Sequence, residues 1–213
     1  MSNLPRRAFL VGTASAIGLM AVPATVNAEV SIMQPDIDDT DAWGANPPNG
    51  TVPILDGQPN KIILHHTVST NTDDFSRDQA HAHAQWCQEL HQDGNGWVDT
   101  GYNFIVSRGG YITEGATGSL SATQDGSSFA QGAHTAGEND QSVGLSAEGT
   151  YSDGASPPAD QWDSMVALAA WVANQYDIPS AEIYGHQDFS STACPGEFQD
   201  RLGEFRDAVD AAR

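Results

Sequence analysis

Positive charge is scarce in this chain of 213 residues. It has 8 lysines and arginines against 28 aspartates and glutamates, and two of the arginines, Arg6 and Arg7, lie in a leader that we expect to be removed. The remaining six basic and 28 acidic residues give a net charge of −22. Such a charge argues against binding nucleic acid or an anionic membrane, because both are themselves negative. An acidic surface also keeps a protein soluble in high salt, so a halophilic source is our hypothesis.

Cysteine is nearly absent as well, since the chain has only Cys87 and Cys194. The ordinary interpretation of such a pair in an exported protein is a disulfide. We instead assign Cys194 to a metal site and Cys87 to the interior, where a thiol behaves as a small apolar side chain. The disulfide remains the alternative.

Long apolar runs are missing outside the first 28 residues. The twin arginines precede an apolar run there, and Val-Asn-Ala ending at Ala28 is a small-residue cleavage site, which predicts a signal peptide over residues 1–28. Arg-Arg-Ala-Phe-Leu is similar to twin-arginine signals. The run is short and contains Pro23, so we do not expect a permanent membrane span. We expect a secreted protein, exported by the twin-arginine route.

The rest of the chain is long enough for one domain. Residues 29–57 are rich in Asp, Asn, Pro and Gly, which predicts an extended arm without regular elements, pinned to the body by Trp43. The domain itself is expected over residues 58–213. Its predicted strands cover 61–66, 102–106, 111–113, 142–148 and 183–184, its predicted helices cover 75–91, 159–176 and 195–211, and 119–128 is predicted to be a loop.

Two segments carry side chains that bind metals. The stretch GHQDFSSTACPG, residues 185–196, places His186 and Cys194 eight positions apart, and imidazole and thiolate are ligands that zinc prefers. A third ligand is expected from His65 or His66, at the end of a buried strand. Because successive side chains of a strand point to opposite faces, only one of the two can face the metal.

Other histidines fit a metal site less well. His81 and His83 are two positions apart on the first predicted helix and face apart, so we interpret them as solvated bystanders. His91, at the end of that helix, is expected to pack or to cap. A catalytic zinc with three protein ligands keeps one position open for water, whose pKa it lowers. Tyr102 and Thr192 are then candidate hydroxyl donors to the developing oxyanion.

Six motifs in order carry a resemblance: DAWGANPP, IILHHT, HQDGNGWVDTGYNFIV, GAHTAGEN, SVGL and GHQDFSSTACPG. Together they cover about residues 41–205, and they resemble the family of peptidoglycan recognition proteins and type 2 N-acetylmuramoyl-L-alanine amidases, to which phage lysozyme-type amidases are related. The resemblance implies a single α/β domain with a mixed central β-sheet flanked by about three α-helices. It also implies a zinc hydrolase that cleaves the amide between N-acetylmuramic acid and L-alanine of peptidoglycan, as a monomer.

The resemblance also assigns roles to residues. It makes the first histidine of the HHT motif a ligand, so that the implied zinc ligands are His65, His186 and Cys194. The implied catalytic residues are Tyr102 and Thr192. The implied substrate-binding residues are His134, His66 and Asn139.

The sequence departs from some amidases of this type at one position. Ser146 stands where those branches have a glutamate, which leaves Glu148 as a reserve candidate for a carboxylate base. A non-catalytic peptidoglycan-binding module and a zinc amidase for another acylated amine are the alternative functions. Binding-only members of the family typically lack the ligand cysteine, so Cys194 favours the enzyme.

The assignment of the cysteines can be tested by counting thiols. We expect two titratable thiols in protein that has been denatured and stripped of metal without a reductant, because neither cysteine is in a disulfide. A count of zero would establish the disulfide instead.

Overall fold

Six strands form the central sheet of the protein, whose computed structural model describes Met1 and residues 32–213. Strands β4, β7, β3 and β8 are parallel to one another, whereas β5 is antiparallel to β4 and β1 is parallel to β5. The predicted mixed sheet is therefore confirmed. The spatial order is β1 (Ile37–Asp38), β5 (Ile112–Glu114), β4 (Phe104–Val106), β7 (Ser142–Ala147), β3 (Lys61–His66) and β8 (Ile183–Gly185).

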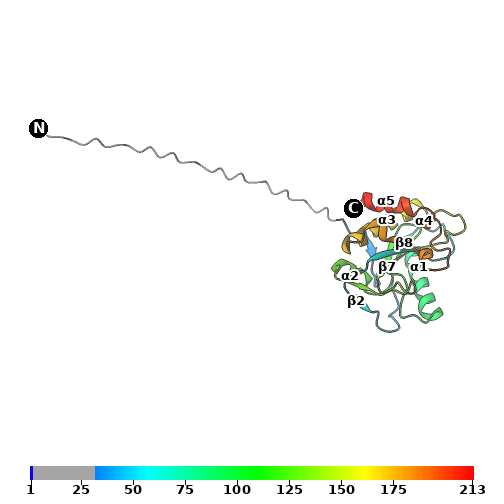
Figure 1. The fold of residues 1–213 in the computed structure, drawn as a ribbon. Helices are drawn as coiled ribbons and strands as arrows, with labels where there is room; N and C mark the ends of the chain where they lie inside the picture. The colour runs from blue at the N-terminus through cyan, green and yellow to red at the C-terminus, as the bar shows by residue number, and fades with distance from the viewer. Residues whose placement is uncertain (2–31) are drawn as a thin grey trace. The chain divides into compact units, whose positions relative to one another are not determined.

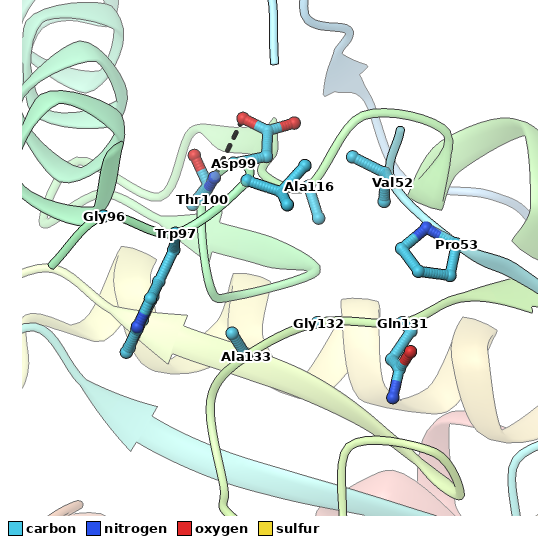
Figure 2. A pocket seen from close by; sticks show the side chains of 11 residues that line it. Val52, Pro53, Gly96, Trp97, Asp99, Thr100, Ala116, Gln131, Gly132 and Ala133 are labelled. Atoms are coloured by element: carbon cyan, nitrogen blue, oxygen red, sulfur yellow. Dashed lines mark hydrogen bonds between the residues drawn. The ribbon is translucent and has the colours of Figure 1, made fainter. Parts of the chain in front are cut away.

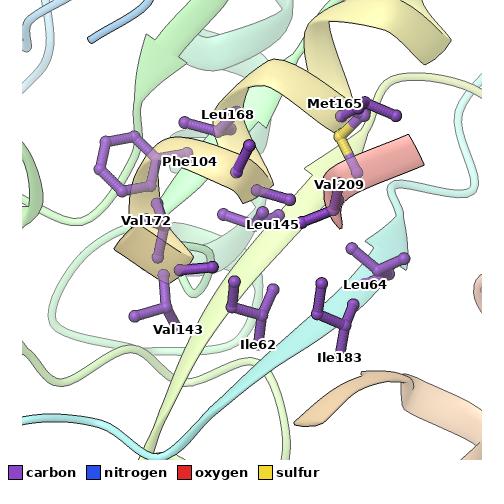
Figure 3. Close-up of a cluster of buried hydrophobic side chains, with 14 of the residues drawn as sticks. Ile62, Leu64, Phe104, Val143, Leu145, Met165, Leu168, Val172, Ile183 and Val209 are labelled. Carbon is purple, nitrogen blue, oxygen red and sulfur yellow. The ribbon is translucent and has the colours of Figure 1, made fainter. Parts of the chain in front are cut away.

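One face of the sheet packs on helices α3 (Ala159–Gln175) and α5 (Leu202–Ala212), which lie together in Figure 1. Alternate strand residues such as Ile62, Leu64 and Leu145 supply this core, and Figure 3 shows them facing Val172 and Val209 of the helices. Because strand side chains alternate, a slip of one residue in β3 would turn Ile62 and Leu64 away from these helices. The core therefore fixes which face His65 occupies.

Helix α1 (Arg77–Glu89) covers the opposite face (Figure 1). The side-chain oxygen of Ser76 caps it by accepting a hydrogen bond from the Gln79 N–H, and its residues Ala84 and Cys87 are buried. A π-helical turn, Leu90–Gly94, extends the helix toward the next loop.

The N-terminal arm contains two short strands, contrary to prediction. In addition to β1, strand β2 (Ile54–Asp56) pairs with β6 (Ser128–Ala130) in a separate antiparallel ribbon. Partners distant in sequence supply the pairing, so local composition did not reveal it. Trp43 pins the arm as expected: its side chain is 2% exposed, and its Nε1–H donates to the Glu114 carbonyl at 2.8 Å.

Two further predictions were wrong in detail. The expected loop at 119–128 contains helix α2 (Ser119–Asp125), which Gly118 and Gly126 bound with φ angles of 91° and 71°. The expected last helix divides into α4 (Glu197–Asp200) and α5, with Arg201 between them. Its guanidinium lies 3.8 Å from the centre of the Trp162 ring, a contact that sequence spacing does not encode.

The predicted signal peptide lies, apart from Met1, outside the residues that the structure describes. Among the described residues, no helix combines the length and the apolar character that crossing a bilayer requires.

Candidate metal centre

Three side chains from distant parts of the sequence meet beside the central sheet. His65 lies near the end of β3, and His186 directly follows β8, whose Gly185 pairs with Leu64. Cys194 lies on the loop that follows. One potential ligand atom from each of these three residues lies within 4.8 Å of the others. The set predicted from the sequence and the resemblance is thus brought together, and the HHT motif contributes its first histidine.

Backbone hydrogen bonds hold the loop that carries His186 and Cys194. The Gln187 N–H donates to the Cys194 carbonyl at 2.8 Å, which ties the two ends of the loop together. The Gly185 N–H donates to the Asp188 carboxylate at 3.0 Å. The His66 N–H points at the Cys194 sulfur at 3.3 Å, so the loop is also attached to β3.

The geometry and chemistry of these side chains fit a zinc ion. The Cys194 Sγ lies 3.7 Å from the His65 Nδ1. Tetrahedral zinc with bonds of about 2.3 Å to sulfur and about 2.0–2.1 Å to nitrogen would set these two atoms roughly 3.6 Å apart. Burial holds the pKa of His65 well below its ordinary value and also lowers the pKa of His186, so both imidazoles offer a neutral nitrogen. Burial raises the pKa of the Cys194 thiol to about 12, and a coordinated metal would displace its proton.

Tyr102 lies against the same site. Its ring centre is 5.3 Å from that of His65 and 5.3 Å from that of His91, whose Nδ1 accepts a hydrogen bond from the Gly101 N–H at 2.9 Å. The packing role predicted for His91 is therefore confirmed. Burial, followed by the nearby thiols, raises the pKa of Tyr102, so the phenol keeps its proton and can donate. Ser146 pairs with His65 across the sheet, and within the described part of the protein its buried hydroxyl has no hydrogen-bond partner.

Thr192 lies on the exposed part of the ligand loop. Its Oγ1 accepts a hydrogen bond from the Cys194 N–H at 3.2 Å. The hydroxyl proton remains available for a substrate oxygen. The catalytic roles expected of Tyr102 and Thr192 stay predictions.

His134 has a different position from the open groove that the resemblance implied. It is 7% exposed, and its Nδ1 lies 3.1 Å from the His65 Nε2, the ring nitrogen that faces away from Cys194. A Cβ at Gly144 would lie 2.5 Å from the His134 ring, so only glycine leaves room for it. His134 thus supports a candidate metal ligand instead of lining an open groove.

His66 and Asn139 were also expected to bind substrate. His66 is 2% exposed, and its Nδ1 accepts a hydrogen bond from the Tyr151 N–H at 3.0 Å, on the face of the sheet that packs on α3 and α5. This corrects the expectation, because strand alternation turns His66 away from the candidate centre. The Asn139 Oδ1 accepts a hydrogen bond from the Thr135 N–H at 2.8 Å, which holds the loop of His134. Substrate contact by Asn139 stays a prediction.

Glu148, the reserve base, lies beside α1 instead of the metal ligands. Its carboxylate accepts hydrogen bonds from the Gln79 side chain at 2.8 Å and the Arg108 N–H at 2.9 Å, and burial raises its pKa. His83 lies next to it and is 5% exposed, so the prediction of a solvated side chain was wrong. His81 is partly exposed and contacts Asp38 at 2.7 Å.

An apolar cavity of about 320 Å³ adjoins the segments that carry Tyr102 and His134. Figure 2 shows Val52 and Pro53 on one side of it and Trp97 on the other, with Gly132 and Ala133 along its wall. The Asp99 carboxylate is already occupied by the N–H groups of Thr100 and Thr117. Sequence reasoning did not identify this cavity, because Val52 and Pro53 lie in the arm.

Known proteins share this sequence pattern. The peptidoglycan-recognition protein SC1a/b of Drosophila simulans is 31% identical over 163 residues, which cover 72% of this chain and 76% of that protein. The human N-acetylmuramoyl-L-alanine amidase is 30% identical over 163 residues, which cover 73% of this chain and 25% of that protein.

Solved structures share the fold. Wild-type peptidoglycan-recognition protein LB of Drosophila has a TM-score of 0.65 at 27% identity, over 76% of this chain and 88% of that one. The amidase LysC of Clostridium intestinale has a TM-score of 0.62 at 26% identity, over 83% and 99%.

The model of the N-acetylmuramoyl-L-alanine amidase family matches residues 55–197, which is more than half of the chain. The match includes the three candidate ligands and the residues discussed beside them, namely His65, Tyr102, His134, His186, Thr192 and Cys194. The chain therefore belongs to the N-acetylmuramoyl-L-alanine amidase family.

Proposed function

We propose that the protein is a secreted, zinc-dependent N-acetylmuramoyl-L-alanine amidase that hydrolyses the amide between the lactyl group of muramic acid and L-alanine in peptidoglycan. The observation that carries the proposal is the convergence of His65, His186 and Cys194, with the protonated phenol of Tyr102 beside them. A protein that only binds peptidoglycan has no need of a buried cysteine next to two neutral imidazoles.

In this proposal the candidate ligands bind the metal, and the neighbouring hydroxyl groups act on the substrate. When bound, zinc supplies an activated water and polarises the amide carbonyl. His65, His186 and Cys194 would hold the ion, and the negative sulfur would temper its charge. Tyr102 and Thr192 donate hydrogen bonds to the carbonyl oxygen, which becomes negative as the amide carbon turns tetrahedral.

The cavity of Figure 2 receives the peptide side of the substrate in this proposal. Its apolar wall, and an Asp99 carboxylate that already accepts hydrogen bonds from protein N–H groups, suit a peptide stem better than a free cation. In support, a peptidoglycan recognition protein of the LE type, with a TM-score of 0.68 at 25% identity, is known in complex with tracheal cytotoxin, a monomeric diaminopimelic acid-type peptidoglycan.

A chain of hydrogen bonds behind His65 selects the tautomer that zinc needs. The Ser142 hydroxyl donates to the Glu138 carbonyl at 2.7 Å, so it can only accept from the His134 Nε2–H, 3.4 Å away. The His134 Nδ1 is then an acceptor for the His65 Nε2–H at 3.1 Å. The remaining nitrogen of His65, Nδ1, carries the free lone pair that points toward Cys194. Such outer partners orient metal ligands in many proteins.

The proposed reaction is tested by digesting purified murein with the intact protein, with and without a chelator. Free stem peptides in the mass spectrum, their loss with the chelator and their return with zinc are the expected results. Murein that stays uncut by zinc-loaded protein, or is cut equally by Cys194→Ala, would contradict the proposal.

Replacing His134 tests the hydrogen-bond chain. His134→Ala should weaken zinc binding by about 10- to 100-fold, because His65 loses the acceptor that sets its tautomer. His134→Gln, which keeps an acceptor and a donor, should recover most of the affinity, and His81→Ala is the control histidine. The measurement is a zinc titration against a competing chelator. Wild-type affinity in folded His134→Ala would refute the role.

The pH dependence of zinc affinity tests the thiol ligand. The pKa of Cys194 is raised and those of His65 and His186 are lowered, so near neutral pH binding releases one proton, which comes from the thiol. The association constant should therefore rise about tenfold between about pH 6 and pH 7. Cys194→Asp, whose carboxylate is already ionised there, should show little change. A flat profile for the wild type would exclude the thiol.

Replacing Tyr102 tests the phenol donor. Tyr102→Phe should keep its zinc and lose turnover by on the order of 10²-fold, the usual effect of removing one oxyanion donor. Tyr111→Phe is the matched control, since that ring is 37% exposed and belongs to another part of the fold. Unchanged turnover in Tyr102→Phe would remove this residue from the mechanism.

A further inference from the structure

A second cavity, of about 580 Å³, opens where β3 and β7 end. Val68, two residues after β3, and Glu148, directly after β7, form part of its wall, and α1 contributes Gln79, His83 and Trp86. The carboxyl ends of parallel strands are the usual place for a ligand in an open α/β sheet. None of the proposed zinc ligands lines this cavity, so it requires its own explanation.

Trp86 presents a fixed aromatic surface to this cavity. Its side chain is 40% exposed, and one face of the indole stacks on the His83 ring at 5.3 Å and 27°. His83 cannot easily move, because its Nδ1 lies 3.6 Å from the Glu148 carboxylate and its Nε2 lies 3.5 Å from the Cys87 sulfur. A buried Glu–His–Cys row therefore supports an exposed indole.

The rest of the cavity wall is polar but offers little free charge. Ser69, Thr70 and Thr72 contribute hydroxyl-bearing side chains, and the carboxylate of Glu148 is 1% exposed and already accepts hydrogen bonds from protein donors. A neutral ligand with many hydroxyl or amide groups fits such a wall better than an ion does.

The loop at the rim is held in a strained conformation. Val68 has a φ of 57°, which is rare for a β-branched residue, and its side chain is 65% exposed. Hydrogen bonds fix the next residue, since the Gly149 N–H donates to the Ser69 hydroxyl at 2.9 Å and the Thr150 hydroxyl to the Ser69 carbonyl at 2.8 Å. Strain that the surroundings maintain is typical of binding sites.

We propose that this cavity is a sugar subsite, in which a pyranose ring of the glycan strand stacks on Trp86 and its hydroxyl or acetamido groups bond to the polar wall. A sugar has an apolar C–H face and a polar edge, which match an indole beside hydroxyls and an amide. The volume lies within the range of small-molecule sites. The inference rests on the proposed function for its ligand. Val68 follows His65 by three residues, a span of at most about 10 Å, so the glycan strand of a murein whose lactyl amide lies at the metal centre passes close by.

The probe is an oligomer of N-acetylglucosamine, which contains no lactyl amide and so binds without being cut. Titration calorimetry of the zinc-loaded full chain should show binding, weakened on the order of tenfold in Trp86→Ala. Leu90→Ala is the matched control: Leu90 is 43% exposed, one turn further along, and outside the cavity. Circular dichroism verifies that each variant is folded.

A kinetic comparison separates this inference from the proposed function. Trp86→Ala should lower kcat/KM about tenfold on polymeric murein and by a smaller factor on a single N-acetylmuramoyl peptide, which lacks the neighbouring sugars of the glycan strand. No oligomer binding by the wild type, or equal binding by Trp86→Ala and Leu90→Ala, overturns the sugar subsite even if murein is cut. Oligomer binding that depends on Trp86 in a protein that cuts no murein supports the subsite and refutes the amidase.

Discussion

The register of β3 between β7 and β8 is the constraint on which the candidate centre depends. Ile62 and Leu64 are held in the core beneath α3 and α5, so His65 must point to the other face and His66 back again. The pairing of Leu64 with Gly185 then makes His186 the neighbour of His65. Apolar packing on one face of the sheet thus determines the position of polar side chains on the other.

Burial has a second effect, on protonation. It keeps the imidazoles of His65 and His186 neutral and the phenol of Tyr102 protonated, the states that a ligand and a hydrogen-bond donor need. The Cys194 thiol is the exception, because burial disfavours its ionised form until a cation compensates the charge. In our proposal the two imidazoles of the folded chain are already in the protonation state that zinc requires. Only the proton of the Cys194 thiol has to be released when zinc binds.

Sequence reasoning succeeded where a signal was local. The apolar run before His65 predicted a buried strand. The spacing of His186 and Cys194 predicted one loop with two candidate ligands, and the resemblance chose His65 over His66 as the third. Sequence reasoning failed where tertiary contacts determine the structure. Strands β1 and β2 form only by pairing with partners distant in sequence. The last helix, predicted as one, is interrupted at Arg201, whose guanidinium packs on the Trp162 ring. The contact of His134 with His65 was not predicted for the same reason, because the two residues are 69 positions apart in the sequence. The position of Trp86 in a helix does not by itself indicate a cavity, because the cavity also requires the loop after β3.

X-ray absorption at the zinc edge of the purified, active protein tests the central claim most directly. The account predicts one zinc per chain with a sulfur at about 2.3 Å and nitrogen or oxygen neighbours at about 2.0–2.1 Å, two of them with the scattering pattern of imidazole. Zinc without a sulfur neighbour, or folded and active protein without zinc, would contradict it.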